Sequence, residues 1–285
     1  MRTVAAKELR TLTAIIEKRK IEMVVSPARA GIAYYSVRSR SARMRFITGC
    51  RSDRGLVRDV NEDAFLVDDR CLAVADGLGG HKAGEVASRM AIELLGALGS
   101  SMPSTDEEWR GLIRTVNQAV LAAGRFDRRF RGMGTTLTLA ALVADDLVVT
   151  HVGDSRAYLL HDGQIQQLTE DHSLVQTLVS TGTITEEEAM QHISRNVITS
   201  AIGVDEVPRI DVIRTKVQPG DLVIVCTDGL SSLVTGDEIR SIAAETMAGS
   251  DIQTGPQAVA DALTAKALER GGFDNVTVLV GLVTA

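Results

Sequence analysis

Apolar residues recur at helical spacing in the first half of the chain. Between residues 82 and 98 they occupy Ala83, Val86, Ala87, Met90, Ala91, Leu94, Leu95 and Leu98. This spacing places all of them along one stripe and predicts an amphipathic helix over 82–98. Further helices are predicted over 106–123, near 237–247 and near 256–270.

Short apolar runs between these segments predict β-strands. In chain order they read "MRFITGC", "AFLV", "RCLAVAD", "TTLTLAALVA", "LVVTHV", "RAYLL", "DVIRTKV", "DLVIVCTDG" and "NVTVLVGLV". Asp145-Asp146 and His161-Asp162-Gly163 supply the chemistry of tight hairpin turns. The polar segment 172–196 is predicted to be helical without a strong stripe. The order of elements indicates one α+β domain, in which antiparallel sheets are covered by paired helices.

The composition separates an N-terminal arm from this domain. The chain has 285 residues, of which 45% are hydrophobic, enough for a large core. Its formal net charge is −6, yet residues 1–51 hold twelve basic and three acidic side chains. We therefore expect a basic arm over 1–43 and a catalytic domain over 44–285. The arm is either a solvated, partly disordered tail or a contact for a membrane surface or nucleic acid.

The remaining composition bears on compartment and partners. The acidic body argues against a nucleic-acid-binding core. None of the three cysteines lies in a CxxC pair, which indicates buried thiols in a reducing compartment. No apolar run approaches the roughly 18 residues of a membrane span, and no secretory h-region is present. The expected location is cytoplasmic.

Acidic residues stand at the edges of several predicted strands. These are Glu62, Asp63, Asp76, Asp228 and Asp274. Carboxylates gathered at one rim would repel one another unless a cation lay between them. Oxygen ligands without Cys or His companions favour Mg²⁺ or Mn²⁺ over zinc. The alternative for any single "DG" is a plain turn.

A basic residue precedes the first of these acids. Arg58 stands five positions before Asp63. Its guanidinium could grip a phosphate through two parallel hydrogen bonds. A surface ion pair is the alternative.

Eight segments in order resemble one known family. They are "SDRGLVRDVNEDAF", "VADGLGGHKAGE", "MGTTLT", "VGDSRAYLL", "LTEDHS", "RNVITSAIG", "VCTDGL" and "GGFDNVTVLV". Together they resemble the bacterial metal-dependent protein phosphatases of type 2C (the PPM family), which act on phosphoserine and phosphothreonine. The resemblance covers roughly residues 46–283 and leaves out the arm.

The resemblance implies a fold and a metal centre. The fold would be a four-layer sandwich: two antiparallel sheets packed face to face, with helices on both outer sides. Two Mn²⁺ or Mg²⁺ ions would lie at one end. Asp76 would bridge both ions, Gly77 would offer its carbonyl, and Asp228 and Asp274 would hold one ion. Glu62 and Asp63 would support the other ion.

Further residues receive roles by the same resemblance. Asn275 would orient the cluster and Arg58 would bind the substrate phosphate. Asp154 would join Asp228 at a weaker third metal site. Residues 172–196, including Asn196, would form a flap beside the cleft.

The implied reaction is direct hydrolysis. Two cations would lower the pKa of a bridging water, and the resulting hydroxide would attack phosphorus without a covalent intermediate.

Two departures from the family stand out. Leu78 occupies the place of a histidine that is proposed as a general acid in eukaryotic relatives, and His81 is a weaker candidate for that role. The flap reads His192-Ile193-Ser194-Arg195-Asn196, without the usual proline.

Three functions follow as hypotheses. The leading one is a monomeric Ser/Thr protein phosphatase that reverses a bacterial kinase acting on the same phosphoproteins. The second is a phosphatase of an anti-sigma factor antagonist. The third is a non-catalytic pseudophosphatase, which predicts lost ligands, whereas Asp76, Asp228 and Asp274 are all present.

Overall fold

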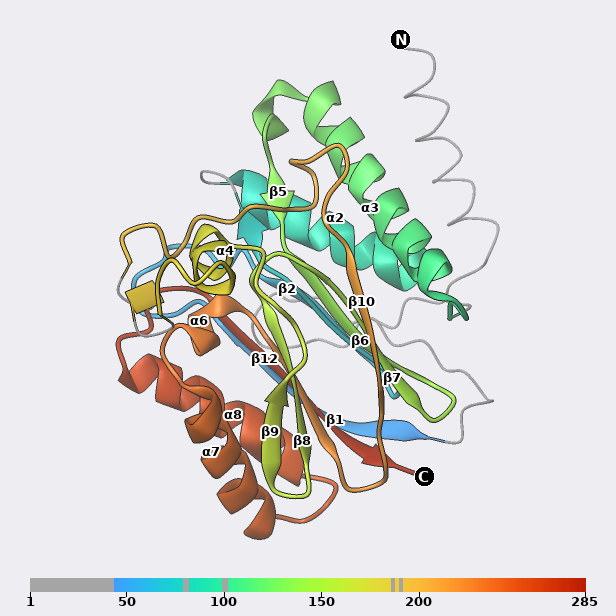
Figure 1. Cartoon of the computed structure of the whole chain (residues 1–285), viewed down its shortest axis with the longest axis vertical. Coiled ribbons are helices and arrows are strands. Elements are labelled where there is room, and N and C mark those ends of the chain that lie inside the picture. The colour runs from blue at the N-terminus through green and yellow to red at the C-terminus, as the bar shows by residue number, and fades with distance from the viewer. Residues whose placement is uncertain (1–43, 79–81, 99–101, 186–187, 190–191) are drawn as a thin grey trace.

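Two five-stranded antiparallel sheets lie face to face at the centre of the molecule (Figure 1). The computed structural model describes residues 44–78, 82–98, 102–185, 188–189 and 192–285. The predicted basic arm over 1–43 lies outside the described residues, as does His81. The division into arm and domain therefore stays a prediction.

Each sheet mixes strands from distant parts of the chain. In spatial order the first sheet contains β1 (Arg45–Asp53), β12 (Val276–Thr284), β11 (Leu222–Cys226), β8 (Arg156–His161) and β9 (Gln164–Gln167). The second contains β10 (Asp211–Lys216), β7 (Asp146–Val152), β6 (Leu137–Val143), β3 (Cys71–Ala75) and β2 (Ala64–Val67). A short ribbon pairs β4 (Gly77–Leu78) with β5 (Gly134–Thr135).

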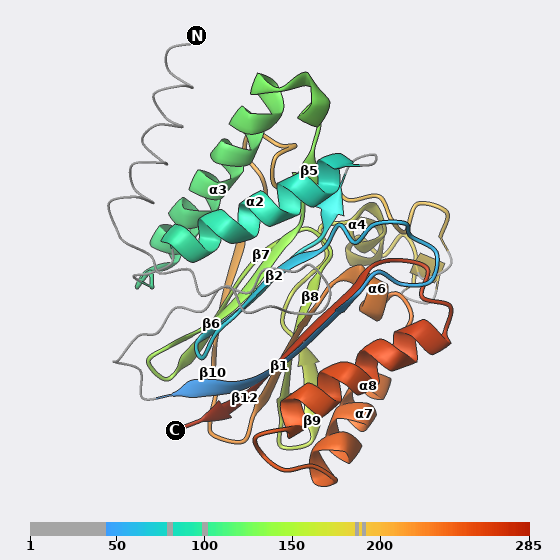
Figure 2. The same cartoon turned by 180° about the vertical axis from the view of Figure 1, so that it is seen from behind.

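Helices cover both outer faces of the pair of sheets. The helix α2 (Lys82–Leu98) and the helix α3 (Asp106–Phe126) pack on the second sheet, and α7 (Gly236–Ala248) and α8 (Gly255–Glu269) pack on the first (Figures 1 and 2). Three shorter helices are η1 (Arg128–Phe130), α4 (Leu174–Ser180) and α6 (Asp228–Ser231). The expected four-layer sandwich is confirmed.

Strands buried on both faces explain the continuous apolar runs. In β3, Leu72 and Val74 point between the sheets, whereas Cys71 and Ala73 point toward α2 and α3. Successive side chains of a strand face opposite sides, so a strand covered on both sides needs apolar residues at every position. Small residues such as Ala73 let the helices approach closely.

Of the two predicted hairpin turns, one is confirmed and the other is displaced by one residue. The turn between β6 and β7 consists of Ala144 and Asp145, because Val143 pairs with Asp146. The predicted Asp145-Asp146 turn is therefore wrong by one residue. The turn between β8 and β9 uses Asp162 and Gly163, both with positive φ (47° and 74°), as expected from its sequence.

Three other features depart from the sequence pattern. The strand β9 is polar and lies at a sheet edge, so its "QIQQ" carries no apolar signal. Segment 172–196 is predicted to be helical throughout, but its described residues are helical at α4, over Leu174–Ser180, and at 188–189. Cys71 and Cys226 are buried free thiols, whereas Cys50 is only partly buried.

Candidate metal centre

Five aspartates from separate strand ends lie at one end of the sandwich, near enough for their charges to act on one another. Asp76 stands between β3 and β4, and Asp228 begins α6 directly after β11. Asp274 comes shortly before β12, Asp63 directly precedes β2, and Asp154 lies in the turn between β7 and β8. Adjacent antiparallel strands bring their connections to a common edge, so residues 211 positions apart can share one site.

The electrostatics show how closely these carboxyls approach one another. Burial raises the pKa of Asp76 well above its ordinary value, and the charges of Asp63, Asp228, Asp154 and Asp274 raise it further. Burial and Asp274 raise the pKa of Asp228 to about 6, although a hydrogen bond with Asp76 opposes the rise. The pKa of Asp154 reaches about 8, from burial and then from the charge of Asp228. A cation between these groups would reverse the penalty on their charged forms.

Asp63 is oriented by two threonines. Thr277 and Thr227 donate to its Oδ2 at 2.6 and 3.0 Å. Burial nevertheless raises the pKa of Asp63 to about 7, with Asp228 and Asp274 adding to the effect. Its other oxygen, Oδ1, is buried and has no hydrogen bond among the described residues.

The backbone around Asp76 is held by a second pair of threonines. Thr136 Oγ1 accepts the Asp76 amide at 2.9 Å, while Thr135 Oγ1 donates to the Asp76 carbonyl at 2.8 Å. Sequence reasoning did not assign these threonines or the pair that orients Asp63. For Thr227 and Thr277 the available signal was their place close to Asp228 and Asp274, in "CTDG" and "DNVTV". Thr135 and Thr136, in "MGTTLT", have no acid nearby in the sequence.

Glu62 and Gly77 lie against the first turn of α2. A Cβ placed on Gly77 would come within 2.5 Å of the Gly84 backbone, so only glycine permits this approach. A Cβ on Gly84 would in turn lie 2.9 Å from both Glu62 Oε2 and the Gly77 carbonyl oxygen. The Glu62 carboxylate thus sits at the positive end of the α2 dipole.

Asn275 joins two loops behind the cluster. Its Nδ2 donates to the carbonyls of Arg54 and Val60, both at 2.9 Å, and its Oδ1 accepts the Glu62 amide at 2.8 Å. One buried amide thereby closes the loop 54–62 onto the segment that carries Asp274.

Arg58 lies at the mouth of the site. Its Nη2 donates to Asp274 Oδ2 at 2.7 Å, and its side chain is 53% exposed. The charges of Asp76 and Glu62 also act on the guanidinium. Arg58 therefore meets the acids and still presents donors to solvent.

The donor set fits a hard divalent cation. Three of its buried carboxylate oxygens have no hydrogen-bond partner among the described residues: Oδ1 of Asp63, of Asp154 and of Asp228. Leaving such an oxygen buried and unpaired costs about 1–3 kcal/mol or more. A bound cation would offset this free-energy cost. No three acidic, His or Cys side chains of the described part already meet as a finished ligand set. The unpaired oxygens, together with the charges that neighbouring aspartates exert on Asp76, indicate where a cation would bind.

The flap begins beside the Asp154 turn. Arg156 donates to both oxygens of Asp171, with Nη2 to Oδ2 at 2.8 Å. Asn196, predicted to belong to the flap, is exposed, and its side chain has no hydrogen bond with the described part of the protein. The role of Asn196 in the flap stays a prediction. Leu78 pairs with Gly134 in the β4–β5 ribbon.

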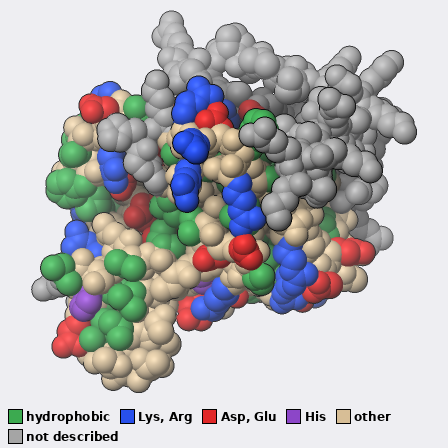
Figure 3. Space-filling view, turned by 90° about the horizontal axis from the view of Figure 1, so that it is seen from above, with side chains coloured by type: hydrophobic (Ala, Val, Ile, Leu, Met, Phe, Trp, Pro, Cys, Tyr) green, Lys and Arg blue, Asp and Glu red, His purple; other side chains and the backbone are tan. Residues whose placement is uncertain are grey.

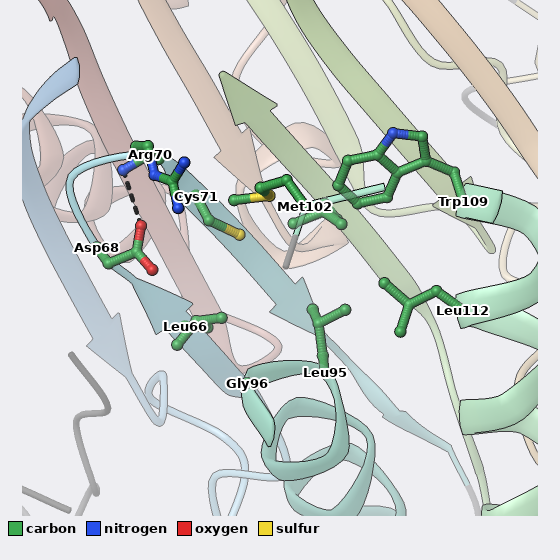
Figure 4. A pocket seen from close by; sticks show the side chains of 10 residues that line it. Leu66, Asp68, Arg70, Cys71, Leu95, Gly96, Met102, Trp109 and Leu112 are labelled. Atoms are coloured by element: carbon green, nitrogen blue, oxygen red, sulfur yellow. Dashed lines mark hydrogen bonds between the residues drawn. The ribbon is translucent and has the colours of Figure 1, made fainter. Parts of the chain in front are cut away.

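A small cavity lies elsewhere, between α2, α3 and strands β2 and β3 (Figure 4). It measures about 30 Å³ and is lined mainly by apolar residues, including Leu95, Met102 and Trp109. Room of this size holds no more than a few water molecules, so the cavity cannot take a phosphorylated substrate. Figure 3 shows acidic side chains in a recess on the left of the face it draws, with hydrophobic side chains next to them.

Comparison with known proteins identifies the family. The model of the family described as protein phosphatase 2C matches residues 57–264. The chain belongs to the protein phosphatase 2C family. The expected resemblance, fold and enzyme class, a protein serine/threonine phosphatase, are confirmed by this match and by the relatives below.

Two curated relatives share about two fifths of their aligned residues with this phosphatase. The serine/threonine phosphatase Stp of Listeria welshimeri is 39% identical over 241 residues, covering 81% of this chain and 93% of the relative. The serine/threonine protein phosphatase PstP of Mycobacterium tuberculosis is 42% identical over 233 residues, covering 81% of this chain. The chain spans 43% of the length of that PstP.

A solved structure of the same fold contains metal ions. The catalytic domain of the phosphatase PstP, in complex with two manganese ions, is 38% identical with a TM-score of 0.75. The match covers 85% of this chain and all of that one. Metal dependence is thus a property of the family. Among the described helices, none has the length and hydropathy needed to cross a membrane.

Proposed function

We propose that this chain hydrolyses phosphoserine and phosphothreonine in proteins with two divalent cations, Mn²⁺ or Mg²⁺. The observation that carries the proposal is the set of three neighbouring aspartates with an unpaired buried oxygen at the end of the sandwich where Arg58 pairs with Asp274. Asp76, Asp228 and Asp274 would hold the ions, with Asp63, Glu62 and the Gly77 carbonyl in support. Bound there, the cations would supply Lewis acidity that activates the attacking water.

The chain's own residues would bind and orient the substrate. Arg58 would use its solvent-facing donors to grip the phosphoryl oxygens, while Asp274 holds the guanidinium in place. The threonine pairs keep Asp63 and Asp76 from turning away. Asn275 fixes the loop that carries Arg58.

Finer parts of the proposal rest on the resemblance. They are the weaker third ion held by Asp154 and Asp228, the flap role of Asn196, a kinase-linked signalling role, a cytoplasmic location and a monomeric state. The closeness of Asp154 to Asp228 supports the first of these. The presence of all three main ligands speaks against a pseudophosphatase.

The test is phosphate release from a phosphothreonine peptide. We expect activity with Mn²⁺ or Mg²⁺ and none after treatment with EDTA. Asp228→Asn should lower kcat by at least about a hundredfold, equal to about 2.7 kcal/mol of barrier. Asp68→Asn is the matched control, since Asp68 lies outside the cluster and its bond from the Arg70 amide suits asparagine equally well.

Two results would contradict the proposal. One is full activity in the presence of EDTA. The other is an Asp228→Asn enzyme with more than about a tenth of the wild-type kcat, because a loss below ~1.4 kcal/mol is too small for a metal ligand.

A further inference from the structure

Large apolar side chains within two residues of Arg58 or Asp274 in the sequence face solvent. Their exposed fractions are 68% for Leu56, 62% for Val57, 46% for Val60 and 62% for Phe273. We call these four residues the apolar ledge. Single exposed apolar residues are common on protein surfaces, whereas a group beside a reactive site marks an interaction surface.

The ledge is continuous with the phosphate-binding position. Val57 directly precedes Arg58, and Phe273 directly precedes Asp274. The ion pair between Arg58 and Asp274, at 2.7 Å, joins the two loops. Apolar residues of both loops therefore lie only one or two residues along the chain from Arg58 or Asp274, and so close to a group bound by Arg58.

The backbone beneath the ledge is firmly supported. The Leu56 amide donates to the Gly272 carbonyl at 2.8 Å, and Asn275 holds the Val60 carbonyl. A Cβ on Gly55 would lie only 2.2 Å from the Asp274 carbonyl oxygen, so the two loops are in direct backbone contact. A surface that is already ordered loses little entropy when a partner binds.

One face of the Phe273 ring is packed against the protein. The ring packs over Gly271, where a Cβ would lie 2.5 Å from the ring's Cζ. Gly271 also has a φ of 117°, which disfavours any other residue there. The rest of the ring is open to solvent. Exposed aromatic rings in a fixed position are typical anchors of protein–protein contacts.

We infer that the apolar ledge binds apolar side chains next to the phosphorylated residue of a protein substrate. This inference rests on the proposed phosphatase function and adds a substrate class: phosphoserine or phosphothreonine flanked by large apolar residues. With the phosphate on Arg58, neighbouring side chains of an extended peptide fall about 3.3–3.6 Å per residue away, over Leu56, Val57 and Phe273. Their burial there removes apolar surface of both partners from water.

The experiment compares two phosphothreonine peptides that differ only in the residues on both sides of the phosphothreonine, leucine in one and serine in the other. For wild-type enzyme with Mn²⁺, we expect kcat/KM to favour the leucine peptide about tenfold, the effect of partly burying one or two leucines. Phe273→Ala and Leu56→Ser should each reduce this preference to about threefold or less, since each removes part of the apolar contact.

Phe126→Ala is the matched control. Phe126 is also an exposed phenylalanine, 78% exposed, but it ends α3 outside both loops. It should keep the tenfold preference. Because each preference is a ratio measured on one enzyme preparation, partial misfolding of a variant cancels out of it.

The outcomes separate the two proposals. Equal kcat/KM for both peptides with wild-type enzyme, or an unchanged preference in both ledge variants, overturns the inference while phosphatase activity stands. Failure to hydrolyse either peptide or p-nitrophenyl phosphate with Mn²⁺ counts against the proposed function itself.

Discussion

Single buried charges dominate the behaviour of the site. Asp63, Asp154 and Asp228 each keep an oxygen unpaired within the described structure, and burial raises all three pKa values. Such an arrangement lowers the stability of the fold by itself and gains stability when a cation binds. A substitution that removes one of these charges should therefore weaken metal binding and stabilise the metal-free fold.

Asp228→Asn should reveal this opposition. Without metal, the variant should melt a few degrees above wild type, because one buried negative charge is gone. Excess Mn²⁺ should raise the melting temperature of wild type, with about 2.7 kcal/mol gained at a hundred times Kd, and barely affect the variant. Asp68→Asn should respond to Mn²⁺ as wild type does. A full Mn²⁺ response in Asp228→Asn would exclude this residue as a ligand.

Glu238 lies away from the metal centre, and its contribution to the stability of the fold should depend on pH. Hydrogen bonds from Arg270, then from Thr235, lower the pKa of Glu238 to about 2. A lowered pKa stabilises the fold fully above the ordinary value near 4.5, and this contribution is lost as pH falls toward 2. The melting-temperature deficit of Glu238→Gln should thus be largest near neutral pH and shrink between pH 4.5 and 2.

Glu245→Gln is the control for this pH series. Glu245 is exposed on the same helix and makes no ion pair with any described residue. Its substitution should leave the melting temperature unchanged at every pH. A deficit for Glu238→Gln that stays constant down to pH 2 would show that the Arg270 pair does not contribute as described.

At the scale of elements, His172 ties the start of the flap to the sheet. Its Nδ1 accepts the Gly153 amide at 3.2 Å, and its Nε2 bonds to Asp211 Oδ2 at 3.1 Å. The Gly153 carbonyl also accepts the His172 amide, and Thr199 donates to the His172 carbonyl. One buried ring thereby joins the Asp154 turn, the flap and β10.

Asp211→Ala should loosen this connection. A buried His172 N–H without its acceptor costs about 1–3 kcal/mol, so the free energy of unfolding should fall by that amount. Hydrogen exchange over 172–180 should become faster. Asp211→Asn keeps an acceptor and should behave like wild type. Arg209→Ala removes exposed pairs with Asp211 and Glu170 but leaves the His172–Asp211 bond, and it should also change little. Equal exchange rates in Asp211→Ala and Asp211→Asn would disprove the role.

Element boundaries show where local sequence is informative. The helix predicted over 82–98 agrees with α2, because its stripe packs against one face of the second sheet. The strand β9 was missed because an edge strand of four polar residues pairs through its backbone alone. The helix predicted over 172–196 is too long, because the polar residues of this segment form no apolar face that could pack against a sheet.

At the scale of the whole molecule, the basic arm is expected to be dispensable for the fold. Residues 1–43 lie outside the family match and carry no convincing apolar stripe. A protein of residues 44–285 should keep the melting temperature and the kcat for p-nitrophenyl phosphate of the full chain. Any contact of the arm with an acidic partner or anionic lipid should weaken with salt, since charges are screened within about 8 Å at physiological ionic strength.

The truncation also tests the proposed boundary. An insoluble or inactive protein of residues 44–285 would show that the arm is part of the fold. A moderately shorter deletion, of residues 1–30, is the control that separates loss of the arm from damage to β1, which begins at Arg45.

The sequence by itself determined the layers and the chemistry of the site. Apolar periodicity depends on neighbours along the chain, and it sufficed for α2, α3 and the buried strands. The acids at strand ends, together with Arg58, indicated a hard cation and a phosphate. Only the tertiary structure decided which atoms meet. The orientation of Asp63 by Thr227 and Thr277, the Arg58–Asp274 pair and the apolar ledge each join segments more than 160 residues apart, and no local pattern encodes such contacts.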